Sequence, residues 1–541
     1  KMVHAAPSGG PAGANERPVR NVPTSQAERD AFVLSDEEAL TLARWAVVIE
    51  RHYGCPMDME WARDGLTQDL YIVQARPETV QSRLGAGVLR THTVGAHGKV
   101  LAKGLSIGSA AISAPVCVIR DVADIARFVD GAILVTEVTD PDWVPIMKRA
   151  SAIVTDHGGR TSHAAIVSRE LGLPAVVGAG DATYHLHDEQ VVTVSCAEGD
   201  EGFVYEGAAE VTLEDLSLDG IPETRTRVML NMANPAAALR WWRLPSDGVG
   251  LARIEFVINN AVKAHPMALL HPERAHPDER EALAAVTAGF ENGAAYFVER
   301  LSRGLARIAA AAWPNPCIVR MSDFKTNEYA GLLGGSLFEP HESNPMIGFR
   351  GAARYTSDLY REGFALECRA IRALRETIGL DNVVVMIPFC RTLAEADGVL
   401  EVMASAGLKR GDDLQVYVMC EIPANVILAD EFAKRFDGFS IGSNDLTQLT
   451  LGVDRDSDLL AGDFDERDPA VHWMVGHAIE AAHAAGAKIG LCGQGPSDHP
   501  EIAEFLVAKG IDTISVTPDS FVAVKRRVAE AEAEGVAVRA A

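Results

Sequence analysis

From Arg225 to its last residue, the chain alternates short apolar segments with longer segments that have helical periodicity. Strands joined by connections of ten or more helical residues run parallel, since a short hairpin joins only antiparallel strands. Eight such units predict a (β/α)₈ barrel, which binds its ligands at the carboxyl ends of the strands. The predicted strands are Val228–Met232, Gly248–Ile254, Cys317–Met321, Met346–Arg350, Val383–Ile387, Val416–Cys420, Gly438–Ile441 and Lys488–Leu491.

Polar side chains follow these predicted strands. Alone, each has an ordinary interpretation: arginines form surface ion pairs, a glutamate caps a helix, and a cysteine fills a core. Together, three arginines, two carboxylates and a thiol suit a small phosphorylated carboxylate that is bound through a divalent metal. In predicted order they are Arg253 after strand two, Arg320 after three, Arg350 after four, Glu421 after six, Asn444 and Asp445 after seven, and Cys492 after eight.

A glycine pair, a histidine, a short helix and an apolar strand follow one another in the first half of the chain. Gly158–Gly159 lets the backbone come close to a ligand, and Thr161 or Ser162 can cap a helix that begins at or just before His163. The positive end of this helix and the cation of Arg160 favour an anion on the imidazole. His163 is therefore a candidate phosphoryl carrier, and the alternative is that it only begins a buried helix.

The segments around His163 predict a compact α/β domain, residues 99–206. The flanking stretches 78–98 and 207–224 are interpreted as linkers, and the barrel takes 225–541. Before them, residues 1–28 have a loop composition, a capped helix follows over 36–53, and two strands, Met57–Trp61 and Leu70–Gln74, form a hairpin. Alternation places Glu60 and Gln74 on one polar face together with Arg76, a pattern that ordinary exposed strands also show.

The composition of the chain excludes some classes of function. With 50 Lys and Arg against 75 Asp and Glu, the net charge is −25, which argues against nucleic acid or an anionic membrane as the partner. The eight cysteines include no Cys-x-x-Cys pair, and neither a signal peptide nor an apolar run of membrane-spanning length occurs. We expect a cytoplasmic protein with reduced thiols. Because the chain starts with Lys1, we also expect an upstream part to exist.

The run Thr155–Gly178 closely resembles the phosphohistidine (swivelling) domain of phosphoenolpyruvate synthases, pyruvate phosphate dikinases and enzyme I of the sugar phosphotransferase system. Around the barrel, the motifs 250–256, 319–329, 342–351, 441–448 and 492–494 resemble the phosphoenolpyruvate/pyruvate-binding barrel of the same enzymes. The resemblance implies that His163 carries the phosphoryl group. It further implies substrate binding by Arg253, Arg320, Arg350, Glu421, Gly442, Ser443, Asn444 and Asp445, Mg²⁺ on Glu421 and Asp445, and proton transfer by Cys492. A thiol can remove a proton near neutral pH if neighbouring cations lower its pKa.

The synthases fit best, because the 57–78 hairpin is similar to the end of their ATP-grasp nucleotide domain. There the residues matching Glu60, Gln74 and Arg76 belong to the Mg-ATP site, so residues 1–80 are interpreted as a remnant of that domain. The implied reaction converts ATP, pyruvate and water to AMP, phosphoenolpyruvate and phosphate, as in gluconeogenesis, and we expect a homodimer. The alternatives are a dikinase, an enzyme I-like phosphotransferase, and a non-enzymatic module that senses phosphoenolpyruvate.

Overall fold

The computed structural model describes most of the chain. Several predictions lie outside the described residues: those for Arg160, Thr161 and Gln494, for residues 5–18 of the predicted loop, and for residues 78–87 of the predicted linker. The described residues are 2–4, 19–22, 24–25, 27–28, 31–77, 88–108, 110–139, 143–159, 162–171, 173–198, 201–218, 220–453, 460, 463–493, 495–518 and 520–540. No helix in these ranges has both the length and the apolar character needed to cross a bilayer.

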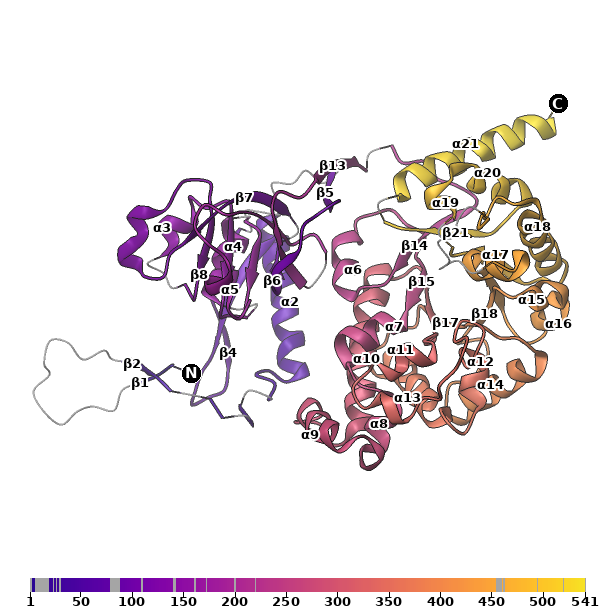
Figure 1. The fold of residues 1–541 in the computed structure, drawn as a ribbon, viewed down its shortest axis with the longest axis horizontal. Helices are drawn as coiled ribbons and strands as arrows, with labels where there is room; N and C mark the ends of the chain where they lie inside the picture. Colours follow the sequence, from indigo (N-terminus) through magenta and orange to yellow (C-terminus); the bar gives the residue numbers. More distant parts are fainter. Residues whose placement is uncertain are drawn as a thin grey trace, which may run out of the picture. The chain divides into compact units, whose positions relative to one another are not determined.

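Eight parallel strands close into a barrel in the C-terminal part of the chain, as predicted (Figure 1). The central strands are buried along their whole length, because helices cover them outside and side chains fill the barrel inside. The strands are β14 (Arg227–Met232), β15 (Val249–Arg253), β16 (Cys317–Arg320), β17 (Val383–Ile387), β18 (Val416–Cys420), β19 (Gly438–Ile441), β20 (Lys488–Leu491) and β21 (Thr513–Val516).

The prediction of a strand at Met346–Arg350 is wrong. This segment is a loop between β16 and the short helix α12 (Ala352–Thr356), and its Ile347 is 52% exposed, whereas the apolar side chains of the eight barrel strands are buried. Closure is completed instead by β21, which pairs with β20 and with β14. The strands after the third are therefore each one place earlier in the barrel than the sequence predicts.

Long amphipathic helices surround the barrel and supply its outer core (Figure 1). In α10, for example, Phe297, Leu301 and Leu305 recur at helical spacing and are fully buried. The longer helices are α10 (Gly293–Ala312), α13 (Arg361–Arg372), α14 (Leu393–Ser405), α18 (Pro469–Ala484), α20 (Pro500–Lys509) and α21 (Phe521–Ala540). Inside the barrel, three members of the apolar cluster, Leu251, Met419 and Cys492, also line the cavity described next.

The segment with His163 forms a second, smaller closed barrel, with strand order β10-β6-β12-β11-β7-β8-β9. Its helix α4 (His163–Leu171) begins at the histidine, as predicted. The strands are β6 (Val100–Ile107), β7 (Ala111–Val118), β8 (Ile133–Thr136), β9 (Ala152–Thr155), β10 (Ala175–Val177), β11 (Val191–Ser195) and β12 (Glu201–Glu206).

Each of the two stretches interpreted as linkers contains a strand. β5 (Val88–Val94) pairs antiparallel with β13 (Val211–Ser217) over seven residue pairs, and the pairing begins where Gly95 N–H donates to Glu210 O at 2.8 Å. The sequence does not reveal this ribbon, because each strand alone lacks a clear apolar alternation. The chain thus enters and leaves the His163 domain through one two-stranded ribbon.

The N-terminal part contains two small antiparallel pairs and one helix. Residues 1–28 are not all loop, since β1 (Met2–His4) pairs with β2 (Val19–Asn21). Helix α2 (Asp36–Tyr53) has the predicted capping box between Ser35 and Glu38. The predicted hairpin is present as β3 (Met57–Arg63) and β4 (Leu70–Pro77).

Candidate functional site

A cavity of about 530 Å³ opens at the carboxyl ends of the large barrel's strands. Its position follows from the fold, since side chains from successive strand ends and the loops after them converge there. The structure brings together in this cavity every residue that the sequence predicts for the barrel site: Arg253, Arg320, Arg350, Glu421, Gly442, Ser443, Asn444, Asp445 and Cys492.

Two carboxylates that the sequence-based prediction missed orient two of the arginines. Asp323 accepts from Nε and Nη2 of Arg350 at 2.9 and 2.6 Å, and Glu255 accepts from Nη2 of Arg320 at 2.8 Å. All four side chains lie on the cavity wall. Burial acts to raise the pKa of Asp323, but Arg350 holds it below its ordinary value. In the sequence, the only indication of a role for these carboxylates was that Glu255 lies two residues after Arg253 and Asp323 three residues after Arg320.

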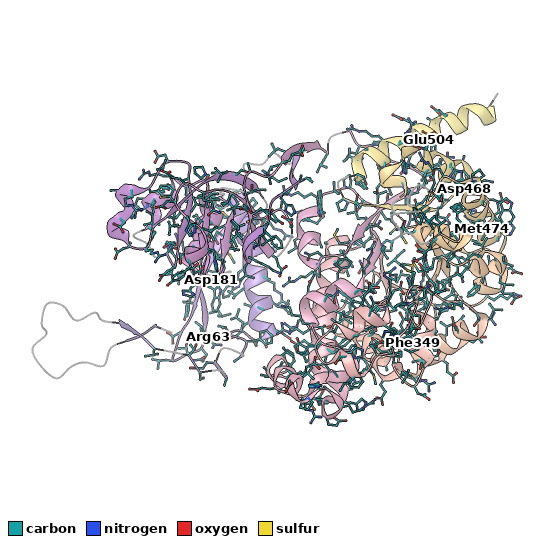
Figure 2. The ribbon with its side chains drawn as sticks, in the orientation of Figure 1. Arg63, Asp181, Phe349, Asp468, Met474 and Glu504 are labelled. Carbon is teal, nitrogen blue, oxygen red and sulfur yellow. The ribbon has the colours of Figure 1, made fainter. Side chains whose placement is uncertain are left out.

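Arg350 reaches the cavity from the loop that was predicted as a strand. Figure 2 labels Phe349, the residue before it. The guanidinium lies 4.1 Å from the ring centroid of Phe389, donates to Met346 O at 3.0 Å, and approaches both carboxylate oxygens of Asp445 at 3.4 Å. A loop thus positions Arg350 as firmly as a strand would, because four different groups hold it.

Glu421 follows β18 and is 1% exposed. One of its oxygens accepts from the backbone N–H of Phe389 at 2.7 Å. Burial raises the pKa of Glu421 to about 8, and the carboxylates of Asp445 and Asp323 act in the same direction. These carboxylates repel one another across the cavity, which is the environment that a bound cation would relieve.

The loop after β19 passes directly over Glu421. A Cβ added to Gly442 would lie 2.7 Å from Oε2 of Glu421 and 2.7 Å from Cε of Met419, so only glycine allows this approach. The next residue, Ser443, begins α17 (Ser443–Leu451) and donates to Glu466 Oε1 at 2.8 Å. The loop therefore presents Asn444 and Asp445 on the first turn of a helix, where backbone N–H groups favour an anion.

Cys492 follows β20 and forms part of the cavity floor, 4% exposed. Its Sγ lies 3.7 Å from Ile441 O. The condition that neighbouring cations lower the pKa of this thiol is not met by the net effect of its surroundings. Burial raises the pKa of the thiol above its ordinary value, although Arg320 and Arg253 oppose the shift. The thiol form therefore dominates near neutral pH.

The donor set of the cavity fits Mg²⁺ better than a metal with an all-protein cage. Among the described residues, no group of three or more His, Cys, Asp and Glu side chains is arranged to hold a metal. Mg²⁺ is commonly held by one or two carboxylates, with water and substrate oxygens completing its six ligands. Glu421 and Asp445, with mutually unfavourable negative charge, fit this pattern.

His163 is half-buried at the first position of α4. Ser162 caps the helix, since its hydroxyl accepts from Ala165 N at 3.4 Å. Nδ1 of His163 lies 3.0 Å from the hydroxyl of Thr139, which the sequence-based prediction did not single out for this role. One ring nitrogen is therefore held by the protein, which leaves the other available for chemistry.

The hairpin residues lie on one exposed face, as predicted from the alternation. Glu60 is directly opposite Gln74 in the register, and Arg76 is opposite Asp58, with which it forms a 3.0 Å ion pair. All four side chains are exposed. The structure brings Glu60, Gln74 and Arg76 together on this face of the hairpin.

A chain that combines a polar cavity at the mouth of a parallel eight-stranded barrel with a separate domain that has a histidine at a helix N-terminus belongs to a class of multidomain α/β proteins. The chain belongs to the PEP-utilising enzyme family: the profile of the PEP-binding domain matches residues 208–533. The mobile domain of the same enzymes matches residues 128–199, and the AMP/ATP-binding domain of pyruvate phosphate dikinase matches 11–91.

Curated relatives named phosphoenolpyruvate synthase match nearly the whole chain. The protein of Synechocystis sp. is 53% identical over 522 residues, which cover 95% of this chain and 64% of the relative. The Escherichia coli protein is 50% identical, with 95% and 64% covered, and the Aquifex aeolicus protein is 47% identical, with 96% and 68% covered. The chain thus spans about two thirds of the length of these relatives.

Proposed function

We propose that this chain carries the phosphohistidine and pyruvate-binding steps of a phosphoenolpyruvate synthase, a phosphotransferase with pyruvate and water as paired acceptors. The overall reaction converts ATP, pyruvate and water to AMP, phosphoenolpyruvate and phosphate. The observation that carries the proposal is the barrel cavity, where guanidinium groups, two carboxylates suited to a cation and a buried thiol meet. The relatives named phosphoenolpyruvate synthase support it.

Each group of the cavity has a role that its chemistry suits. Arg253, Arg320 and Arg350 bind the carboxylate and phosphoryl oxygens, since guanidinium groups pair well with such anions. Arg320 and Arg350 enter the reaction pre-oriented by Glu255 and Asp323, which lowers the cost of ordering them around the substrate. Gly442, Ser443 and Asn444 complete the anion-binding wall at the start of α17.

Mg²⁺ bound by Glu421 and Asp445 would polarise the substrate's carbonyl oxygen and stabilise negative charge on it. Cys492 removes the methyl proton of pyruvate and returns it in the reverse direction. Because burial raises the pKa of this thiol, proton removal requires the small thiolate fraction or a further lowering when substrate binds. The enolate oxygen then attacks the phosphorus atom carried by His163, and the histidine nitrogen leaves.

The contact with Thr139 also selects the reacting nitrogen of His163. Nδ1 is within hydrogen-bond distance of the threonine hydroxyl, so Nε2 is the nitrogen that takes the phosphoryl group. If Thr139 accepts from Nδ1–H, the lone pair that attacks phosphorus is on Nε2.

Glu60, Gln74 and Arg76 belong to the nucleotide-binding part of the protein. The proposed domain boundaries are 1–80, 99–206 and 225–541. A cytoplasmic homodimer completes the proposal.

Two measurements test the proposal. Label from ³²P-phosphoenolpyruvate should appear, acid-labile, on the peptide that contains His163 when Mg²⁺ is present. The variant His163→Gln should take no label but should still exchange the methyl protons of pyruvate with solvent deuterium, because the enolisation residues all lie in the barrel. Wild-type protein that takes no label, or that shows no exchange with Mg²⁺, would contradict the proposal; the latter result is what a phosphoenolpyruvate sensor would give.

A further inference from the structure

Behind the cavity wall, four oxygen atoms form a closed ring. Oε1 of Glu367 on α13 lies 2.5 Å from the hydroxyl of Ser322, which lies 2.6 Å from that of Tyr329 on α11 (Thr326–Ala330). The Tyr329 hydroxyl is 2.5 Å from that of Tyr360, which is 2.8 Å from Oε1 of Glu367 again. All four side chains are at most 1% exposed, so water does not take part in the ring.

The ring allows its protons to be counted. Four oxygen–oxygen contacts of 2.5 to 2.8 Å need four protons, one between each pair of oxygens. Ser322, Tyr329 and Tyr360 supply three. If Glu367 is ionised, one contact of Tyr329 has no proton, and two oxygen lone pairs face each other at hydrogen-bond distance. A fourth proton on Glu367 fills the ring, with every hydroxyl both donating and accepting.

The ring holds the segment that carries two residues of the site. Ser322 lies between Arg320 and Asp323, and all of its polar groups are bound from behind. Its N–H donates to Oε2 of Glu367 at 3.1 Å, and its carbonyl accepts from the hydroxyl of Tyr355 at 2.5 Å. Because Asp323 in turn orients Arg350, a change in the ring reaches two of the arginines on the cavity wall.

The surroundings of Glu367 favour its neutral form. Burial raises the pKa of Glu367 to about 7, whereas the bonds from Ser322 and Tyr360 act to lower it. The ionisable groups that interact with it also include Glu255, Cys368, Tyr329 and Tyr355, which are acidic groups. The nearby cation Arg354 is bound to Glu339 through two bonds, at 2.6 and 2.7 Å.

We propose that Glu367 is a positioning residue. As a neutral carboxylic acid it closes the ring and holds the 320–323 segment in the geometry that binds a phosphorylated substrate. Loss of its proton as the pH rises weakens binding of this substrate at the barrel. The inference that Glu367 is protonated is based on the geometry of the ring alone. Its effect on the substrate rests on the function proposed above. The two parts are therefore tested by separate measurements.

Infrared spectroscopy tests the protonation directly. At pH 6 the spectrum of the wild-type chain should contain the carbonyl band of a protonated, buried carboxyl group that is absent from Glu367→Gln, and the band should disappear as the pH rises through about 7. Glu362→Gln, an exposed change of equal charge on the same helix, should keep the band. An unchanged spectrum in Glu367→Gln would overturn the assignment, whatever reaction the protein catalyses.

Tyr329→Phe provides a second variant that keeps both hydroxyl donors to Glu367. Without the Tyr329 hydroxyl, two contacts remain, and the protons of Ser322 and Tyr360 fill both of them while Glu367 is ionised. The contact that has no proton in the wild type is then absent, so ionisation of Glu367 costs less. The carboxyl band should therefore be lost at a lower pH than in the wild type. A band that is lost at the same or a higher pH would show that the ring does not hold the proton.

Phosphoenolpyruvate binding, measured by calorimetry with Mg²⁺ between pH 6 and 9, tests the second part. Glu421 also loses its proton in this range, so the diagnostic is the difference between variants whose cavity walls are identical. The loss of affinity that accompanies the Glu367 transition should be roughly fivefold, the value of one buried hydrogen bond. It should move to lower pH in Tyr329→Phe. If the infrared band moves but the binding curve does not, the ring is structural only. If no variant binds, the proposed function is at fault.

Discussion

Phe389 has a backbone conformation that phenylalanine rarely adopts. Its φ of 43° lies in the left-handed region, at a cost on the order of 1–3 kcal/mol. Two contacts in the site compensate for this strain: its N–H donates to Glu421, and its ring lies 4.1 Å from the guanidinium carbon of Arg350 and 4.6 Å from that of Arg391. Phe389 thus links a carboxylate suited to Mg²⁺ with an arginine that we propose binds substrate.

Phe389→Leu should raise the KM for phosphoenolpyruvate about threefold to tenfold, because Arg350 loses the ring but Glu421 keeps its backbone donor. Steady-state kinetics of the phosphoenolpyruvate-dependent labelling of His163 provides the measurement. Phe338→Leu is the matched control, since that ring faces Arg274 at 4.9 Å and lies outside the cavity. Equal effects of the two substitutions would show that the aromatic contact is not specific to the site.

Cys492→Ala should reduce deuterium exchange into the methyl group of pyruvate by at least about 100-fold, the usual contribution of a positioned acid or base. In the wild type, burial raises the thiol's pKa, so the thiolate fraction, and with it the exchange rate, should keep rising from pH 7 to pH 9. Proton NMR follows both. A rate that reaches its plateau below pH 7 would contradict a buried thiol as the base, and unchanged exchange in the variant would exclude Cys492.

The residues of the site were predictable to the extent that each follows a strand or a glycine turn. Arg253, Glu421 and Cys492 stand immediately after apolar runs, and the barrel rule alone places them at one mouth. Asp323 and Glu255 were missed because their function is to orient arginines, and an acidic residue near an arginine in sequence is usually a surface ion pair. The ring around Glu367 joins two segments, 322–329 and 360–367, and no local pattern in the sequence shows that these two segments meet.

At the scale of elements, the sequence predicts seven of the eight barrel strands, because buried parallel strands are continuous apolar runs. Met346–Arg350 imitates such a run with Met, Ile and Phe, but Glu342 accepts from Phe349 N and winds the segment into a loop. The true last strand, Thr513–Val516, has only four residues and was not distinguished from the ends of its neighbouring helices. The sequence of such a short apolar run does not show whether it is a strand or with which strand it pairs.

The close approach of the β19–α17 loop to Glu421 leads to a third prediction. Gly442→Ala should weaken Mg²⁺-dependent phosphoenolpyruvate binding at least about tenfold, because the added methyl group would displace either the loop or the carboxylate. Calorimetry at fixed Mg²⁺ measures it. Gly411→Ala is the control, since a Cβ there meets no atom within 4 Å and needs no positive φ. Normal binding by Gly442→Ala would show that the loop can shift without consequence.

At the scale of the whole molecule, the proposed chemistry is divided between two closed barrels. The His163 barrel holds the phosphoryl carrier, and the large barrel holds the enolisation residues. From composition changes, the sequence predicts linkers at 78–98 and 207–224, on either side of the His163 domain. It could not recover the pairing of these two stretches into one ribbon, because β5 and β13 lie more than one hundred residues apart and neither is strongly apolar.

The ribbon provides a test of how the two barrels cooperate. Gly95 N–H donates to Glu210 O, and since bonded pairs of an antiparallel ladder alternate, the next pair along the register is Thr93 with Thr212. Thr212→Pro removes an N–H from this pair and should loosen the ribbon, whereas Thr212→Val keeps the backbone donor. A looser connection lowers the effective concentration of His163 at the barrel mouth.

Phosphoryl transfer from phosphoenolpyruvate to His163 should therefore slow severalfold in Thr212→Pro, as measured by quenched-flow labelling. Pyruvate deuterium exchange should remain at the wild-type rate, because the large barrel performs it without the ribbon. Thr212→Val should match the wild type in both assays. Equal loss of both activities in Thr212→Pro would indicate general unfolding, and unchanged labelling would show that the pairing of β5 with β13 has no part in delivering His163 to its substrate.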